Sequence, residues 1–194
     1  MTERKPLLKR ITEKVTPKKP KASILPSDRP ALSAKEQEWL NALLISAALN
    51  GKNSEIVRLI RTGADITATD SNGWTALHEA AWNGHTKTCA LLIKKYVEAG
   101  EDIKQFIAAK SKDKWTALHF AGRNEYHKIC ILLIIECAKA GGDTKELIAA
   151  KSKDDTTAYD LASGKTAQFL KSMEWLMGIT GNAFMASFGD CIAA

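Results

Sequence analysis

The seven residues IAAKSKD occur twice in this chain, at 107–113 and again at 148–154. The same interval of 41 residues separates Cys89 from Cys130 and Gly100 from Gly141. A second match, SAALNG at 46–51 with EAAWNG at 79–84, has an interval of 33. Repeats of about 20 to 50 residues are typical of solenoids, in which a small unit buries its apolar face only against a copy of itself. The duplication therefore predicts a stack of similar units.

Apolar residues within each unit recur at helical spacing, which predicts an all-α chain. Ordered structure is expected to begin near Ser33, because Ser33 and Glu36 have the spacing of a helix-capping box. A predicted second helix ends at Gly63, since glycine adopts the left-handed conformation that terminates helices. We expect Asn72 and Gly73 to form the centre of a tight turn, with positive φ at both residues.

The stretch from Asp70 to His85 reads D-x-x-G-x-T-A-L-H-x-A-A-x-x-G-H and resembles the ankyrin repeat signature. Similar units follow one another near 42–69, 70–110, 111–151 and 152–176. The resemblance implies an all-α ankyrin solenoid of about four stacked helix-turn-helix units with β-hairpin-like tips. It also implies that threonine and histidine side chains tie each inner helix to the neighbouring repeat. The residues that match this pair are Thr75 with His78, and Thr116 with His119.

The third and fourth units depart from the family at the hairpin. Serine stands in place of aspartate and a non-glycine residue in place of glycine, at Ser111 and Lys114 and at Ser152 and Asp155. A non-glycine residue at positive φ is strained, so these two hairpins are expected to be irregular. The fourth unit is also more polar, which predicts a terminal cap.

The two 41-residue units carry eight extra residues between the outer helix and the next hairpin. The interval is 14 positions from Ile60 to Trp74, but 22 in both later units. Asp102 with Gln105, and Asp143 with Glu146, repeat the capping-box spacing. We therefore predict that each outer helix ends near a glycine and is followed by a short extra helix ending in IAAK. The alternative is an unstructured surface insertion.

The net charge of +6 comes from the first 30 residues, which hold nine basic and three acidic side chains. Residues 1–32 are therefore predicted to be a disordered basic arm, 33–177 the repeat domain, and 178–194 a Gly/Ala-rich tail. No secretory signal and no run of 18 apolar residues is found. The four cysteines lack metal-site spacing, which favours a reducing cytoplasm; Cys89 and Cys130 are expected to be buried as small hydrophobic residues.

No catalytic motif is evident, so we expect no enzyme, no cofactor and no small-molecule substrate. His85 with Cys89 offers two metal ligands on one helix face without a third, and no metal site is predicted. Binding to another protein is expected instead, on the concave surface formed by hairpins and inner helices. The predicted contact residues are Ser71, Asn72, Trp74, Trp82, Asn83, Lys112, Asp113, Trp115, Arg123 and Asn124. The alternative is that the tryptophans only pack over neighbouring hairpins.

The two chain ends suggest further partners. The final residues CIAA resemble a prenylation box, so Cys191 is a candidate lipidation site, and the basic arm could add a second membrane contact. A rival function is nucleic-acid binding by residues 1–32, which predicts affinity that falls steeply with salt. Ankyrin proteins that bacteria deliver into host cells look similar, which gives a host cell as an alternative location.

Overall fold

The computed structural model describes residues 32–180, with side chains through Met173. The basic arm and Cys191 lie outside this range, so the predictions made for them stay predictions. The helices follow in the order α2 (Ala34–Leu49), α3 (Asn53–Arg61), α4 (Ala76–Trp82), α5 (Thr86–Glu98), α6 (Ile103–Ile107), α7 (Ala117–Arg123), α8 (His127–Lys139), α9 (Thr144–Ala149), α10 (Ala158–Leu161) and α11 (Gly164–Thr180).

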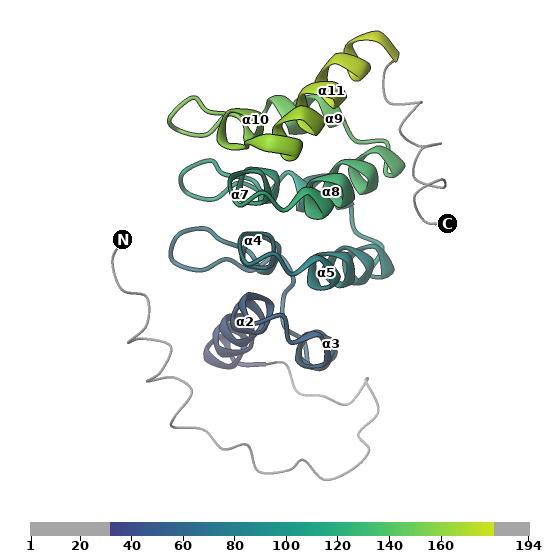
Figure 1. Ribbon diagram of the computed structural model, residues 1–194. Helices are drawn as coiled ribbons and strands as arrows, with labels where there is room; N and C mark the ends of the chain where they lie inside the picture. The colour runs from purple at the N-terminus through teal and green to yellow at the C-terminus, as the bar shows by residue number, and fades with distance from the viewer. Residues whose placement is uncertain (1–31, 181–194) are drawn as a thin grey trace. The chain divides into compact units, whose positions relative to one another are not determined.

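The helices form layers, each made of an inner and an outer helix (Figure 1). The inner helices α2, α4, α7 and α10 contact one another in chain order, and so do the outer helices α3, α5, α8 and α11. Over residues 32–180 the extended structure consists of an isolated bridge between Thr69 and Thr75. The predicted all-α ankyrin-repeat architecture is confirmed.

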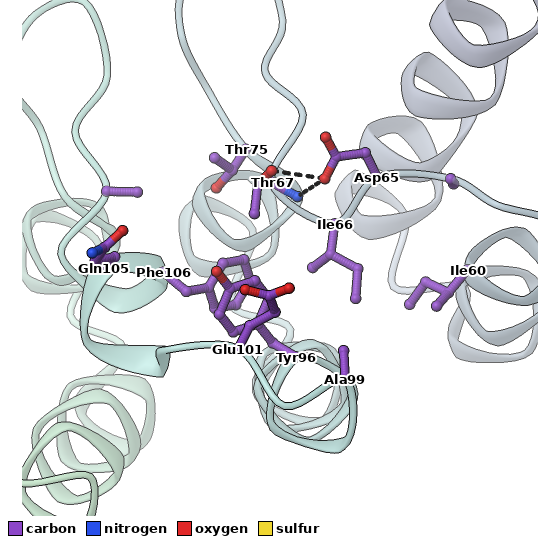
Figure 2. Close-up of a pocket in the computed structure, with 12 residues that line it drawn as sticks. Ile60, Asp65, Ile66, Thr67, Thr75, Tyr96, Ala99, Glu101, Gln105 and Phe106 are labelled. Carbon is purple, nitrogen blue, oxygen red and sulfur yellow. Dashed lines mark hydrogen bonds between the residues drawn. The ribbon is translucent and has the colours of Figure 1, made fainter.

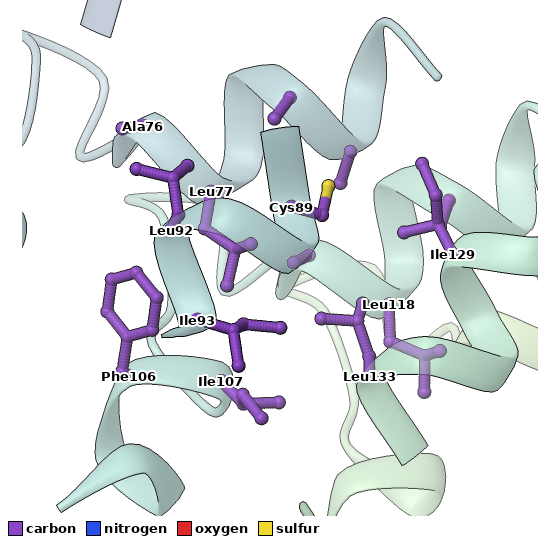
Figure 3. Packing of buried hydrophobic residues seen from close by; sticks show 14 of the residues in the cluster. Ala76, Leu77, Cys89, Leu92, Ile93, Phe106, Ile107, Leu118, Ile129 and Leu133 are labelled. Carbon is purple, nitrogen blue, oxygen red and sulfur yellow. The ribbon is translucent and has the colours of Figure 1, made fainter. Parts of the chain in front are cut away.

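The core runs between the layers as one cluster of apolar side chains. Ala76, Ala80 and Ala81 are fully buried, and their small size lets inner helices approach closely. Leu77, Leu92, Leu118 and Leu133 fill the space between inner and outer helices (Figure 3). Each buried leucine contributes about 2 kcal/mol of transfer free energy, and it does so only because a neighbouring layer covers it.

Cys89, Cys130 and Cys137 belong to this core. Cys89 and Cys130 are free thiols with 0% exposure, which confirms their prediction as small buried residues. Burial raises the pKa of both thiols to about 12. Neither sulfur is therefore a nucleophile near neutral pH.

The helix ends follow the predicted capping chemistry. Glu36 N–H donates to Ser33 Oγ at 3.3 Å, and Ser33 N–H donates to the Glu36 carboxylate at 2.9 Å, so the predicted box is confirmed. Helix α3 ends at Arg61 and Thr62 is its C-cap; Gly63 follows with φ 104°. These short-range bonds satisfy the backbone groups that a helix leaves open at its ends.

The first hairpin turn differs from its prediction. Gly73 has φ 73°, whereas Asn72 is not among the residues with positive φ. Gly73 N–H donates to the Asp70 carbonyl at 3.0 Å, which places Ser71 and Asn72 at the centre of the turn. The Asp70 carboxylate accepts from the backbone N–H groups of Asn72 and Trp74, each at 2.8 Å. This aspartate fixes the turn without positive φ at Asn72, so the predicted turn geometry was wrong.

The next two hairpins keep the same geometry despite their altered sequence. Lys114 and Asp155 take φ values of 59° and 60°, matching Gly73. Lys114 N–H donates to the Ser111 carbonyl at 2.9 Å, and Asp155 N–H donates to the Ser152 carbonyl at 3.2 Å. The prediction that these hairpins are irregular was therefore wrong. Their serine hydroxyls accept backbone N–H groups as the Asp70 carboxylate does, so the turn persists and the strain is tolerated.

The extra residues of the longer units are helical, as predicted, and the unstructured alternative is wrong. Helices α5 and α8 end just before Gly100 and Gly141, whose φ values are 81° and 69°. Asp102 then caps α6 by accepting from Lys104 N–H at 3.0 Å, and Asp143 caps α9 by accepting from Glu146 N–H at 3.0 Å. Helix α6 packs against α5 and α8, and α9 packs against α8 and α11.

The last layer is shorter on its inner side. Helix α10 has four residues, whereas α11 continues to Thr180, beyond the boundary predicted at 177. Glu125 takes φ 60° and its carboxylate accepts from the backbone N–H and the hydroxyl of Ser163 at the start of α11. Partial burial raises the pKa of Glu125, but these bonds and one from Thr166 outweigh it and lower the pKa. Within residues 32–180, no helix combines the length and apolarity needed to span a bilayer.

Candidate protein-binding surface

The hairpin tips form a continuous edge because each tip is tied to the next. Lys112 N–H donates to the Asn72 carbonyl at 2.9 Å, and Lys153 N–H donates to the Asp113 carbonyl at 3.0 Å. Lys112 and Asp113 are exposed, and Asp113 also lies 3.3 Å from Lys153 Nζ. Of the predicted contact residues, Lys112 and Asp113 thus lie on a fixed row with exposed side chains, whereas Asn72 in the same row is half-buried.

Behind this row, three tryptophans converge on one phenylalanine. Phe120 is 3% exposed, and its ring centroid lies 4.2 Å from Trp74, 5.0 Å from Trp115 and 5.8 Å from Trp82. Trp74 and Trp82 also meet each other edge to face at 6.0 Å. Each tryptophan is half-buried, so part of each ring remains on the surface. We call Trp74, Trp82, Trp115 and Phe120 the aromatic cluster.

Phe120 was not among the contact residues predicted from the sequence. The signal was available, because Phe120 occupies the repeat position held by Glu79 in the second unit and Ser46 in the first. A large aromatic residue at a position that is polar in the two preceding units marks a specialised surface. Aligning the units position by position would have found it.

Arg123 extends the aromatic cluster. Its guanidinium carbon lies 5.5 Å from the Trp115 ring centroid, which is within the range of a cation–π interaction. The Arg123 side chain is exposed, so it can also contact a partner. The structure thus brings together the predicted residues Trp115 and Arg123, which are eight positions apart in sequence.

Asn83 and Asn124 have a different position from the other predicted contact residues. Each is the C-cap of an inner helix and half-buried. The Asn83 amide donates to the Glu79 carbonyl at 2.8 Å, and the Asn124 amide donates to the carbonyls of Trp82 and Phe120, each at 3.2 Å. These amide nitrogens are engaged within the chain, and Asn124 links the third layer to the second.

The two Thr-His pairs lie at the starts of α4 and α7. His78 Nδ1 accepts from the Thr75 backbone N–H at 3.0 Å, while its Nε2 lies 3.0 Å from the Ala109 carbonyl oxygen and donates to it. In the second pair His119 Nδ1 likewise accepts from the Thr116 N–H, at 3.2 Å, but its Nε2 donates to the Thr156 carbonyl at 3.2 Å. Each imidazole therefore joins its inner helix to the backbone of the following unit's hairpin region, before the turn for His78 and after it for His119.

Burial sets the charge of these histidines. It lowers the pKa of His78 from 6.5 to about 4, and it also lowers the pKa of His119. Both rings are therefore neutral at pH 7. In the part of the chain that the structure describes, no three His, Cys, Asp or Glu side chains gather in a way that could hold a metal ion.

Comparison with known proteins agrees with this architecture. A model of the family described as ankyrin repeats (3 copies) matches residues 44–145, so the chain belongs to the ankyrin repeat family. It is similar to ankyrin repeat domain-containing protein 39 of Homo sapiens, with 45% identity over 49 residues. That match covers 25% of this chain and 27% of the human protein, so the chain spans about a quarter of this relative's length. Ankyrin repeats are generally non-catalytic modules for protein–protein interaction.

Proposed function

We propose that this chain is a non-catalytic adaptor that binds a partner protein on the surface made by its hairpin tips and inner helices. The observation that carries the proposal is the aromatic cluster, three half-buried tryptophans held against Phe120 beside an exposed arginine. Tryptophan and arginine are the residue types that contribute most to binding energy when a partner covers them. The polar hairpin row supplies the rim that such interfaces usually have.

The aromatic contacts also favour affinity through rigidity. Because each tryptophan is already packed on Phe120, little side-chain entropy is lost when a partner covers its exposed face. The same packing means that the tryptophans stabilise the stack. A test of binding must therefore use substitutions that leave Phe120 covered.

The test uses photo-crosslinking from two faces of the full chain. A benzophenone amino acid is placed at Lys112 on the hairpin row or at Lys128, an exposed residue of the outer helix α8. We expect a specific partner to crosslink from position 112 and not from position 128. Crosslinking of the same partner from both positions with equal yield would contradict the proposal.

The affinity of that partner is then measured with purified chains. Arg123→Glu should weaken binding at least tenfold, because the reversed charge replaces a predicted central contact. Lys128→Glu makes the same change of charge on α8 and should have no effect. Circular dichroism confirms that both variants keep their helices. Prenylation at Cys191 and nucleic-acid binding by residues 1–32 stay predictions that the proposal does not use.

A further inference from the structure

A cavity of about 650 Å³ is present whose lining includes no residue of the aromatic cluster. It lies between the end of α3, the last turn of α5, and α6 (Figure 2). Ile66 points into this space from the first linker, and the stacked rings of Tyr96 and Phe106 lie across from it. The ring centroids of this stack are 4.4 Å apart, with an interplanar angle of 12°.

The cavity exists because the first linker is eight residues shorter than the later ones. In the later layers an insertion helix from the preceding unit packs against the outer helix: α6 contacts α8, and α9 contacts α11. Helix α5 has no such cover, since α3 leads directly into the first hairpin. The cavity therefore occupies the place that an insertion helix fills in the layers that follow.

One pair of equivalent residues shows the difference. Cys137 holds in α8 the position that Tyr96 holds in α5, 41 residues earlier. Cys137 is 4% exposed. Lys104 of α6 lies beside it: a Cβ added to Gly142 would touch Cys137 Sγ and would lie 3.0 Å from Lys104 Cγ. Tyr96 is only half-buried and lines the cavity. Tyr96 is therefore an apolar contact site that lacks an insertion helix of the kind that α6 provides beside its equivalent, Cys137.

The rim of the cavity is acidic. Asp65 and Glu101 line it and are exposed, and Asp102 lies next to Glu101 in sequence. The pKa of the Tyr96 hydroxyl is raised, first by burial and then by the negative charges of Glu101, Asp102 and Asp65. An occupant with basic side chains would therefore be favoured over an acidic one.

We propose that this cavity is a second docking site, which receives a short amphipathic helix from a partner protein. The chemistry of the occupant follows from the helices that cover the equivalent places. In α6, Ile103, Phe106 and Ile107 are buried at i, i+3 and i+4. The docked helix carries apolar side chains at this spacing against Tyr96 and Ile66, and lysine or arginine facing Asp65 and Glu101. This site is independent of the partner proposed for the aromatic cluster.

The probe is a fluorescein-labelled 16-residue peptide with isoleucine, leucine and isoleucine at i, i+3 and i+4 in an alanine-lysine background. Anisotropy is measured as the full chain is added. We expect saturable binding, and at least tenfold weaker binding of a scrambled peptide with the same composition. Failure of the peptide to bind saturably, or equal binding of the scrambled peptide, overturns the proposal.

Two variants locate the site. Asp65→Lys with Glu101→Lys should weaken peptide binding at least tenfold, whereas Glu38→Lys with Asp154→Lys makes the same net change on exposed acids outside the cavity and should have no effect. Ala99→Trp fills the cavity from an exposed helix end and should abolish binding, while Val97→Trp, on an exposed residue of the same helix that does not line the cavity, should not.

Other outcomes separate this site from its alternatives. Arg123→Glu should leave peptide binding unchanged, so failure at either surface is distinguishable from failure at the other. Loss of peptide binding in Arg123→Glu but not in Ala99→Trp overturns the proposal. Sedimentation that shows self-association abolished by Ala99→Trp, without peptide binding, assigns the cavity to a second copy of this chain and also overturns it.

Discussion

The buried histidines predict how the stability of the stack depends on pH. His78 is 1% exposed, with Nδ1 accepting from the Thr75 N–H and Nε2 donating to the Ala109 carbonyl. A proton added to Nδ1 would face the Thr75 N–H and break this bond. Burial, the largest cause, lowers the pKa to about 4, and repulsion from His119 acts in the same direction; the Ala109 hydrogen bond and the Asp70 charge oppose it only in part.

The sign follows from comparing the folded and unfolded chains. An unfolded histidine has a pKa of 6.5, so between pH 6.5 and about 4 the unfolded chain binds the proton and the folded chain does not. Stability is therefore greatest above pH 6.5 and falls as the pH decreases through this window. The difference between the two pKa values corresponds to about 3 kcal/mol in total, of which about 2 kcal/mol is lost between pH 7 and pH 5. The lowered pKa of His119 adds a loss of the same sign.

Urea unfolding followed by circular dichroism at pH 7, 6 and 5 measures this loss. Carboxylates such as Asp160 and Glu125 have lowered pKa values, so most of their contribution is lost below their ordinary values of 3.8 and 4.5, and only a small part is lost between pH 7 and pH 5. His78→Gln should remove most of the dependence. A wild-type chain that loses less than about 0.5 kcal/mol between pH 7 and pH 5, or a His78→Gln variant with an unchanged pH slope, would refute the reasoning.

Four further predictions follow from backbone strain, helix capping and burial. Lys114→Gly should stabilise the chain by about 0.5 kcal/mol in urea unfolding, because relief of the left-handed strain at φ 59° exceeds the added freedom of unfolded glycine. Glu125→Gly should destabilise it by about 1 kcal/mol, since the carboxylate caps α11, and a change of the same sign in both variants would contradict this account. Gly84→Ala should cost about 2 kcal/mol in thermal unfolding, because φ is 74° and a Cβ would lie 2.7 Å from the Tyr126 ring; an unchanged melting temperature would be the contrary result. A thiol reagent at pH 8 should leave three of the four cysteines unlabelled until denaturant is added, since burial raises their pKa values to about 11 or 12, and labelling of more than one thiol in the native chain would argue against such burial. The protected thiols are those of Cys89, Cys130 and Cys137.

Features set by neighbours along the chain were predictable from the sequence. The box at Ser33 and the caps at Asp102 and Asp143 depend on residues two or three positions apart. The helical insertions followed from the same local spacing. The turn at Asn72 failed as a prediction because the Asp70 carboxylate, two residues earlier, redirected the backbone bonds.

The candidate binding surface was predictable only in part. Trp74 and Trp115 could be placed on equivalent hairpins from the period alone. Their convergence on Phe120 could not, because it depends on how far each layer is displaced and rotated relative to the last. The regular hairpins at Lys114 and Asp155 also depend on the third dimension, since bonds between successive tips help to hold them.

The sequence by itself determined the repeat, its caps and the length of each linker, because these are periodic or short-range properties. Only the tertiary structure decided that a missing insertion after Ile60 leaves an open cavity beside Tyr96. The length of the linker alone does not predict a cavity, because the cavity forms only when the layers stack. Stacking brings residues of successive units into contact, and it leaves α5 without an insertion helix from the preceding layer, whereas α8 and α11 each contact one.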